Sequence, residues 1–152
     1  MSDTDARMRE LMSQQPVPEF PDPAFVQPKP LAESRVAIVT TAALHTEGDP
    51  GWQPGSDPRY TVLDAKERAV QMGHFSPNFD RGGFAADLNV VYPADRLEEL
   101  AARGTIGSVA SHHYAFAGNQ PEGLSELRLD TGPACAEALK ADGVDVVLLT
   151  PV

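Results

Sequence analysis

Histidine is the side chain best suited to proton transfer near neutral pH, and this sequence contains four of them. His45 follows the apolar, β-branched run RVAIVTTAA (35–43), and His113 follows the run TIGSVAS (105–111). Each run has the composition of a strand. Because parallel strands end at the same edge of a sheet, we expect His45, His113 and the residues after Leu149 to lie at one edge.

Polar and aromatic side chains are concentrated in SHHYAFAG (111–118), and we predict the segment HHYAFAGNQPEG (112–123) to be a loop after the strand. Tyr114 can donate a hydrogen bond to a substrate there. The alternative interpretation is that Tyr114 and Phe116 pack beneath the loop. For each histidine taken alone, an ordinary hydrogen-bonded position in a loop is the simpler interpretation.

A second polar segment, HFSPNFDRGG (74–83), contains His74, Asn78 and Asp80. We interpret Asn78 and Asp80 as candidate substrate-binding residues, together with His112. An Asx turn at Asn78 or Asp80 would explain the same residues structurally. The glycine pair at 82–83 fits either a turn or a close approach of the backbone to a ligand.

Other kinds of site find little support in the sequence. His45, His74, His113 and Asp80 could in principle share a metal, but histidines on separate loops lack a ligand-spacing signature, so we expect none. Cys135 lies among alanines in a predicted helix and is interpreted as a small buried hydrophobe. The sequence contains no GxSxG motif, phosphate-binding loop or dinucleotide fingerprint.

The elements that position these residues alternate between strands and helices. We predict strands at 35–43, 59–63, 105–111 and 144–150, and helices at 94–104 and from near Pro133 to Gly143. A long irregular segment separates the first strand from the first of these helices. The alternation predicts an α/β fold, with a Rossmann- or flavodoxin-like parallel sheet and covering helices.

A different composition precedes this domain. Residues 1–15 have the spacing of a short helix, with Met8, Leu11 and Met12 on one face. The prolines of PVPEFPDPAFVQPKP (16–30) exclude a regular helix and indicate an extended arm. We therefore divide the chain into an N-terminal arm, residues 1–33, and an α/β domain, residues 34–152.

Composition excludes several classes of partner. The chain has 152 residues, a net charge of -10 and a single cysteine. The acidic balance argues against nucleic acid and against anionic membranes. One cysteine cannot form an internal disulfide, and no apolar run approaches the roughly 20 residues of a membrane span. The polar N-terminus does not resemble a secretory signal, so we expect a cytoplasmic protein.

Several segments together resemble one family. They are SRVAIVTTAALH (34–45), HFSPNFD with DLNVVYPADRLEELAARGTIGSVASHHYAFAG (within 74–118) and LKADGVDVVLLTPV (139–152). They are similar to the N-terminal part of selenoprotein B, the B-subunit family of the glycine, sarcosine, betaine and D-proline reductases. The resemblance covers most of residues 31–152.

The resemblance implies an oxidoreductase that reductively cleaves a carbon–nitrogen bond of a small amine or amino acid. In this family a selenocysteine or cysteine attacks the carbon, and it follows the strand that resembles DGVDVVLLTP. A helix N-terminus at that place would lower the pKa of the thiol or selenol. We therefore expect no cofactor in this chain, and a selenocysteine, cysteine or pyruvoyl group on a downstream or partner chain.

The same resemblance assigns candidate roles to individual residues. His45, His74, His113 and Tyr114 match family positions that line the expected pocket, so they are the candidate catalytic residues. His112 departs from the more usual basic or polar residue at its position and ranks lower. The substrate itself stays open, because the family acts on several amines.

Three explanations are open for the sequence stopping at Val152. A UGA codon can encode selenocysteine there, a second gene can supply the remaining part, or a precursor can be cleaved. Each predicts that residues 1–152 alone leave an open sheet edge that needs a cover. We expect a second polypeptide that completes the domain, and hence a hetero-oligomer. The alternative function is a non-catalytic binding or assembly subunit, which the proline-rich arm would suit.

Overall fold

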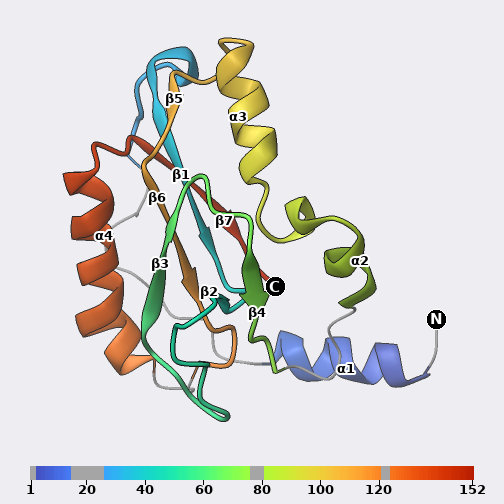
Figure 1. The fold of residues 1–152 in the computed structure, drawn as a ribbon. Helices are drawn as coiled ribbons and strands as arrows, with labels where there is room; N and C mark the ends of the chain where they lie inside the picture. The colour runs from blue at the N-terminus through green and yellow to red at the C-terminus, as the bar shows by residue number, and fades with distance from the viewer. Residues whose placement is uncertain (1–2, 15–25, 76–80, 121–123) are drawn as a thin grey trace.

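The computed structural model describes residues 3–14, 26–75, 81–120 and 124–152 (Figure 1). The strands are β1 (Arg35–Thr40), β2 (Leu44–Thr46), β3 (Tyr60–Asp64), β4 (Val70–Met72), β5 (Ser108–Val109), β6 (His112–Phe116) and β7 (Val146–Thr150). The α-helices are α1 (Asp3–Ser13), α2 (Arg81–Ala86), α3 (Ala94–Ala102) and α4 (Gly132–Ala141). Shorter helical turns are η1 (Leu31–Glu33), η2 (Leu88–Val90) and η3 (Leu127–Thr131).

The central strand β1 has parallel neighbours on both sides. It pairs with β7 from Val36 opposite Val146 to Thr40 opposite Thr150. On its other side it pairs first with β5 and then with β6. Strand β3 pairs with β6 in the antiparallel direction. The predicted α/β fold is therefore confirmed, with one antiparallel strand added to the mostly parallel sheet.

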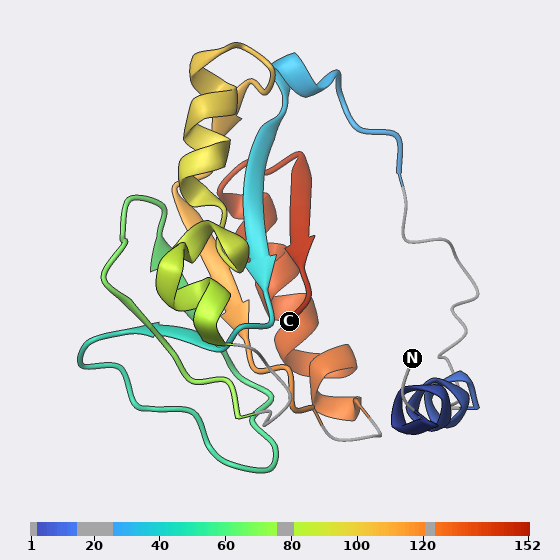
Figure 2. The same ribbon diagram turned by 90° about the vertical axis from the view of Figure 1, so that its right-hand side faces the viewer.

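Helices cover both faces of this sheet (Figure 2). Ile38 of β1 belongs to one buried cluster with Leu97 of α3, whereas Ala37 belongs to a second cluster with Cys135 and Leu139 of α4. Successive side chains of a strand point to opposite faces, so β1 contributes to both clusters. Full burial of a side chain such as Ile38 contributes about 1.5–3 kcal/mol.

The prediction that residues 112–123 form a loop is wrong for His112–Phe116, which form β6. This strand pairs with β3 on one side and β1 on the other. Its last four residues are buried, although the sequence begins with two histidines. Pairing on both sides satisfies the backbone of this segment, and a loop at the surface would not bury it.

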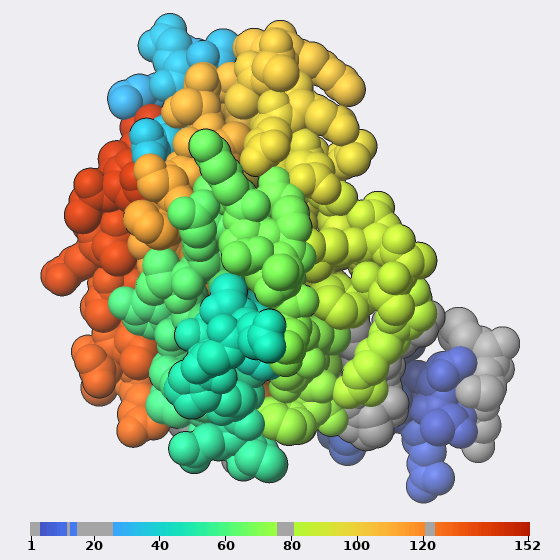
Figure 3. Space-filling model, viewed as in Figure 1, coloured from blue at the N-terminus to red at the C-terminus, as the bar shows by residue number. Residues whose placement is uncertain are grey.

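The long segment between β1 and α3 is also more ordered than predicted. It contains the expected strand near residues 59–63, observed as β3, and two further short strands, β2 and β4, which pair with each other. Helix α2 and the turn η2 complete it. In Figure 3 this segment, coloured teal to green, covers the front of the molecule.

Helix α4 continues a helical stretch that begins earlier than the sequence indicated. Residues 125–126 are α-helical, and η3 (Leu127–Thr131) is a π-turn that leads directly into α4. A Cβ on Gly132 would collide with the backbone carbonyl oxygen of Leu127. Glycine at this position therefore allows the tighter approach that the π-turn requires.

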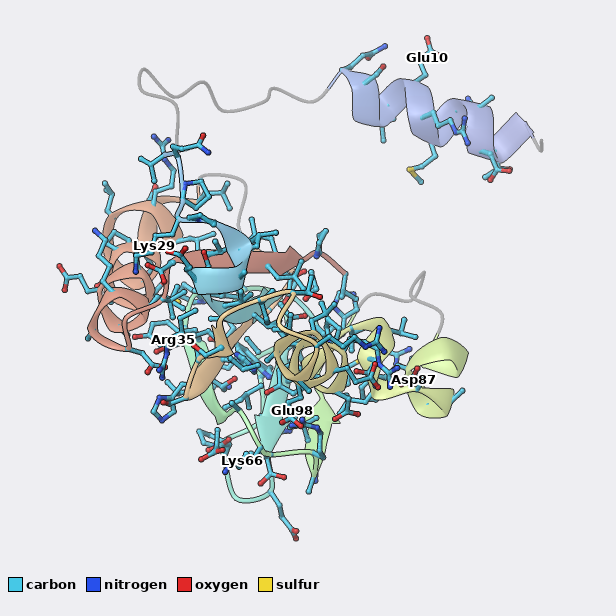
Figure 4. The ribbon with its side chains drawn as sticks, turned by 90° about the horizontal axis from the view of Figure 1, so that it is seen from above. Glu10, Lys29, Arg35, Lys66, Asp87 and Glu98 are labelled. Atoms are coloured by element: carbon cyan, nitrogen blue, oxygen red, sulfur yellow. The ribbon has the colours of Figure 1, made fainter. Side chains whose placement is uncertain are left out.

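Asp142, at the end of α4, connects three elements. Its carboxylate accepts hydrogen bonds from the backbone N–H groups of Ser111 (2.8 Å) and His112 (3.1 Å). It also accepts one from the Arg35 guanidinium at 2.6 Å, on the α4 side of the molecule in Figure 4. Burial raises the pKa of Asp142, but the hydrogen bonds from His112 and Ser111 outweigh it, so the pKa lies below its usual range.

The outer side of β7 carries no paired strand among the described residues. Leu148 and Leu149 are 38% and 68% exposed there, although the strand is apolar in sequence. Helix α1 confirms the predicted N-terminal helix, and Met8 and Leu11 on it are exposed. Residues 15–25 of the predicted arm lie outside the described residues. No helix in the described ranges is long and apolar enough to cross a bilayer.

We predict that Asp142→Ala lowers the free energy of unfolding by about 2 kcal/mol at pH 7, because two backbone N–H groups and an arginine lose their acceptor. Urea denaturation followed by circular dichroism measures the change. Glu137→Ala on the exposed side of α4 is the control and should change stability by less than about 0.5 kcal/mol. Equal midpoints for the two variants would show that Asp142 does not hold these elements together.

Candidate functional site

The carboxyl ends of β1 and β7 form the place where this fold type binds ligands. In the sheet, β6 lies on one side of β1 and β7 lies on the other. After β1 the chain forms β6 on the first side, and it later forms β7 on the opposite side. The connecting helices α3 and α4 lie on opposite faces. Such a reversal leaves a crevice outside the carboxyl ends of the two adjacent strands.

Two residues just past the ends of these strands, Thr41 and Val152, are held together. The backbone N–H of Val152 donates a hydrogen bond to the Thr41 hydroxyl at 2.8 Å. The backbone N–H of Thr41 donates to the carbonyl oxygen of Thr150 at 3.2 Å. These bonds fix the path of the chain as it leaves β7. They place Val152 beside the end of β1.

His74 lies at the same edge, beside Gly118 at the end of β6. A Cβ on Gly118 would stand 3.1 Å from Cε1 of His74, 3.2 Å from the backbone oxygen of Val152 and 3.4 Å from that of Thr41. The imidazole and two backbone oxygens therefore converge on one point that only a glycine leaves open.

The environment of His74 favours its neutral form. Burial lowers the pKa of His74, a hydrogen bond to the backbone of Thr41 acts in the opposite direction, and the Arg81 guanidinium lowers the pKa further. Arg81 also donates a hydrogen bond to the backbone carbonyl of His74 at 2.7 Å. A neutral imidazole can accept a proton, so His74 has the state that a general base needs.

A cavity of about 500 Å³ opens between this edge and α4. That volume falls within the usual range for small-molecule sites, roughly 300–1,000 Å³. Its lining comprises Val39, Thr41, Phe116, Ala117, Gly118, Gln120, Leu127, Gly132, Cys135, Ala136, Leu139, Val147, Leu149 and Val152. The lining is mostly apolar. Burial raises the pKa of the Cys135 thiol to about 11, so this cysteine stays protonated and is a poor nucleophile.

His113 has a structural role that the sequence did not indicate. It is fully buried near the start of β6, and its Nδ1 accepts a hydrogen bond from the backbone N–H of Ile38 at 3.1 Å. Between β5 and β6 the backbone turns aside, and the carbonyl of Ser111 accepts from Ala65 instead. The imidazole therefore replaces a strand carbonyl as a partner for β1.

The hydrogen bond from Ile38 determines the tautomer of His113. Since Nδ1 is the acceptor, the proton of the neutral ring is on Nε2. Burial lowers the pKa of His113 to about 4. The ring packs edge-on against Tyr92, with the centroids 5.5 Å apart. His113 is thus neutral at physiological pH and does not extend to the carboxyl edge of the sheet, where the sequence placed it.

The other predicted site residues are dispersed. Tyr114 follows His113 on the strand, packs in the α4-side cluster and contacts Tyr60 edge-on at 5.7 Å. His112 is half exposed, and its Nδ1 lies 3.8 Å from the Asp142 carboxylate. His45 lies in β2, with its Nδ1 3.4 Å from the carbonyl oxygen of Ala43. None of these histidines belongs to the cavity lining, and the roles predicted for them stay predictions.

Asn78 and Asp80 lie outside the described residues. Among the residues that the structure does describe, no group of three histidine, cysteine or carboxylate side chains is placed to hold a metal ion. The sequence interpretation missed Thr41 and Gly118. Thr41 directly follows β1 and Gly118 lies two residues after β6, and position just past a buried strand is the signal that could have found them.

Fold and site together define an α/β protein that has helices on both faces of a mostly parallel sheet and a cavity of small-molecule size where the strand order reverses. The chain belongs to the family described as glycine/sarcosine/betaine reductase selenoprotein B (GRDB), whose sequence profile matches residues 7–152. No solved structure matches the chain.

Curated relatives include subunits of several reductases. D-proline reductase subunit gamma of Acetoanaerobium sticklandii is 33% identical over 92% of this chain, which covers 58% of that relative. Glycine reductase complex component B subunit gamma of Carboxydothermus hydrogenoformans is 31% identical, with 87% of this chain and 32% of the relative covered. Betaine reductase complex component B subunit beta of Peptoclostridium acidaminophilum is 28% identical, with 93% and 33% covered. The chain thus spans between a third and rather more than half of these relatives.

The buried His113 predicts a pH dependence of stability. Its pKa is about 4 in the folded protein and about 6.5 when unfolded, so only the unfolded chain binds the proton between these values. The contribution is complete above pH 6.5 and is lost as the pH falls toward 4, by about 3 kcal/mol in total. Urea denaturation at pH 7, 5.5 and 4 measures this loss.

The control for this prediction is the neighbouring histidine. His113→Asn should flatten the pH dependence between 7 and 4, because the titrating group is gone. His112→Asn removes an exposed histidine and should keep the slope of the unaltered protein. A slope that both variants share would contradict the assignment to His113.

Proposed function

We propose that this chain is the N-terminal portion or subunit of a selenocysteine- or cysteine-dependent reductase in the cytoplasm. The reaction is the reductive cleavage of a carbon–nitrogen bond in a small amine or amino acid. The nucleophile is supplied just beyond Val152 or by a partner chain. The observation that carries the proposal is the convergence of His74, Thr41 and Val152 beside an apolar cavity at the switch point.

The residues at this edge suit a nucleophile on the next segment. The Thr41 hydroxyl holds the backbone of Val152, so whatever follows or meets Val152 begins beside His74. A selenol, thiol or pyruvoyl group there would supply the reactive atom that this chain lacks. The neutral His74 can take the proton from a selenol or thiol as its selenium or sulfur forms a bond to the substrate carbon, and return it to the amine nitrogen as the carbon–nitrogen bond breaks. The carbon fragment then stays bound as a selenoether or thioether until a reductant from the rest of the complex releases it.

The other residues that the sequence predicted for the site do not act on the substrate from this cavity in the proposal. His113 is a positioning residue, because its imidazole holds β1 rather than facing the cavity. Tyr114 packs the α4 side of the sheet beneath the cavity. His45, His112, Asn78 and Asp80 stay predicted contributors, whose contact with substrate would depend on the part of the enzyme supplied by the partner or downstream segment.

We also propose that a second polypeptide segment completes the sheet along β7. The support is the unpaired outer side of β7 within the described residues and the exposure of Leu148 and Leu149. An exposed apolar edge strand normally requires a cover. The relatives are named as subunits or complex components, and this chain covers only part of their length.

A second candidate function is a non-catalytic binding or assembly subunit. It is favoured by the exposed apolar side chains of β7 and of α1, where Met8 and Leu11 face solvent. Under this alternative the carboxyl edge would serve only to dock a partner that brings its own catalytic groups.

His74→Gln decides between the two functions. In the reductase, loss of the proton-transferring group should lower kcat by roughly 10²- to 10⁴-fold, because general acid–base catalysis contributes that much. The assay follows amine release by the natively assembled complex from glycine, sarcosine, betaine and D-proline. Glu137→Gln, a substitution at an exposed position of α4 outside the cavity lining, should leave the rate within about twofold. An unchanged rate in His74→Gln would favour the assembly subunit.

Intact mass spectrometry of the complex purified from its native host tests the partner. We expect a second species, or a longer product of the same locus, that carries a selenocysteine, cysteine or pyruvoyl group near the residue that follows β7. A chain of only residues 1–152 that purifies alone, with no reductase activity, would contradict the proposed function.

A further inference from the structure

Gln120 brings to the cavity a hydrogen-bond acceptor whose orientation is fixed. The residue lies four positions after the end of β6 and is part of the cavity lining. Its amide nitrogen donates one hydrogen bond to the carbonyl oxygen of Ala117 at 2.7 Å and another to that of Asp57 at 3.0 Å. Exchanging the nitrogen and oxygen of the amide would set its oxygen against both carbonyl oxygens, so the two bonds determine where Oε1 lies.

The side-chain oxygen of Gln120 has no partner. It is buried, and it accepts no hydrogen bond from any residue that the structure describes. Folded proteins satisfy most buried polar atoms, and an exception indicates a water, an ion or a ligand that completes the site. An amide oxygen accepts hydrogen bonds and cannot donate them. The missing partner of Oε1 therefore carries an N–H or O–H group.

The described lining does not supply this donor. It contains no lysine, arginine or histidine, and its Thr41 hydroxyl is bonded to the backbone of Val152. The Cys135 thiol is a weak donor that packs in the apolar cluster against α4. A water molecule held in an interior needs about two to four polar partners, which a mostly apolar lining does not offer. A ligand that has a hydrocarbon part and one donor matches this cavity better.

The amine end of the proposed substrate fits this acceptor, and the carboxylate end does not. Carboxylate oxygens only accept hydrogen bonds and would be repelled by Oε1, whereas a protonated amine donates. The Gln120 amide is bonded to the carbonyl of Ala117, and His74 lies against the next residue, because a Cβ on Gly118 would stand 3.1 Å from its Cε1. An amine held by Gln120 is thus placed at the segment that the imidazole contacts.

We propose that Gln120 is a specificity-determining residue that accepts a hydrogen bond from the substrate nitrogen. The enzyme then takes an amine or amino acid whose nitrogen carries at least one N–H, in preference to a fully alkylated ammonium. A quaternary nitrogen has the same charge but would place a methyl group against Oε1 and leave the oxygen without a donor. The inference rests on the proposed function and names the part of the substrate that this chain recognises.

Two pairs of probes test the requirement for an N–H group. N,N-dimethylglycine and betaine form one pair, and N-methyl-D-proline and N,N-dimethyl-D-proline form the other. Within each pair both members carry a carboxylate and a cationic nitrogen at pH 7, and they differ by one methyl group and the last N–H. Each probe is measured as an inhibitor of turnover by the natively assembled complex, with glycine and D-proline as the substrates.

The comparison is made in the pair that corresponds to the substrate the complex reduces. We expect the member with an N–H to have an inhibition constant at least about tenfold lower than that of its quaternary partner. Equal constants, tighter binding of the quaternary member, or no inhibition by either member would overturn the proposal.

Gln120→Met assigns the preference to this residue, because it keeps the length of the side chain and removes the acceptor. In this variant the two members of the pair should have inhibition constants within about threefold of each other. The loss should come from weaker binding of the member with the N–H, and binding of the quaternary member should stay within about twofold. A tenfold preference that survives in Gln120→Met would show that another group recognises the nitrogen.

A matched pair of variants ties the preference to this cavity without altering Gln120, so the test stays decisive if Gln120→Met fails to assemble. Ala136 is exposed and lines the cavity, so Ala136→Phe should fill it and raise the inhibition constant of the member with the N–H at least about tenfold. Ala134 is exposed on the same helix and lies outside the lining, so Ala134→Phe should leave that constant within about twofold. Unchanged binding in Ala136→Phe would place recognition elsewhere and contradict the proposal.

Failure of this inference is distinguishable from failure of the proposed function. If the two members of the pair inhibit alike while His74→Gln still lowers turnover by the complex, the reductase stands and Gln120 does not select its substrate. If the complex reduces none of the amino acids, or if His74→Gln leaves turnover unaffected, the reductase assignment itself fails and this inference fails with it.

Discussion

Hydrogen bonding to β1 on both of its sides is the constraint on which the rest of this structure depends. β5, β6 and β7 all form hydrogen bonds with it, so every parallel strand pair of the sheet includes β1. Ala37 and Ile38 in its middle are fully buried in opposite clusters. Both layers of helices and the carboxyl edge therefore take their positions from this strand.

The ladder on one side of β1 is completed by a side chain. Where β5 ends and β6 begins, the backbone turns toward β3, and the N–H of Ile38 would be left without a partner in the core. The imidazole of His113 accepts that hydrogen bond. An unsatisfied buried N–H typically costs about 1–3 kcal/mol, so this histidine maintains the continuity of the sheet.

The parts of the fold that follow hydrophobic periodicity were predictable from the sequence. We could predict β1 and β7 from their continuous apolar runs and α3 from its apolar stripe. These predictions did not require knowing which elements pack against them. β6 was missed because its first two residues are histidines, and polarity alone suggested a loop. Only the three-dimensional pairing shows that His113 is buried with a specific acceptor role, since no local pattern encodes the turn that its ring fills.

The edge at which the cavity lies was predictable, but most of its lining was not. Parallel strands imply a common edge, where the sequence placed His45, His113 and the residues after Leu149. Val152 lies there, beside His74, which the sequence placed in the long loop. The expectation for His113 depended on the residue at which its strand ends, and sequence patterns place such boundaries poorly. Thr41 contributes a hydroxyl that holds the backbone of Val152, and Gly118 contributes only the space that its missing side chain leaves. Neither is a residue type that suggests catalysis when the sequence is considered alone.

The π-turn before α4 has a consequence for helical phase. One extra residue per π-turn shifts every following side chain by on the order of 100° around the helix axis relative to an uninterrupted α-helix. Cys135 and Leu139 face the sheet, and Ala136 faces the cavity, in the phase that this insertion sets. Deleting a single residue within Leu127–Thr131 would rotate the apolar stripe of α4 away from the sheet without changing any residue of α4. The length of this turn therefore determines the cavity wall as much as the side chains of α4 do.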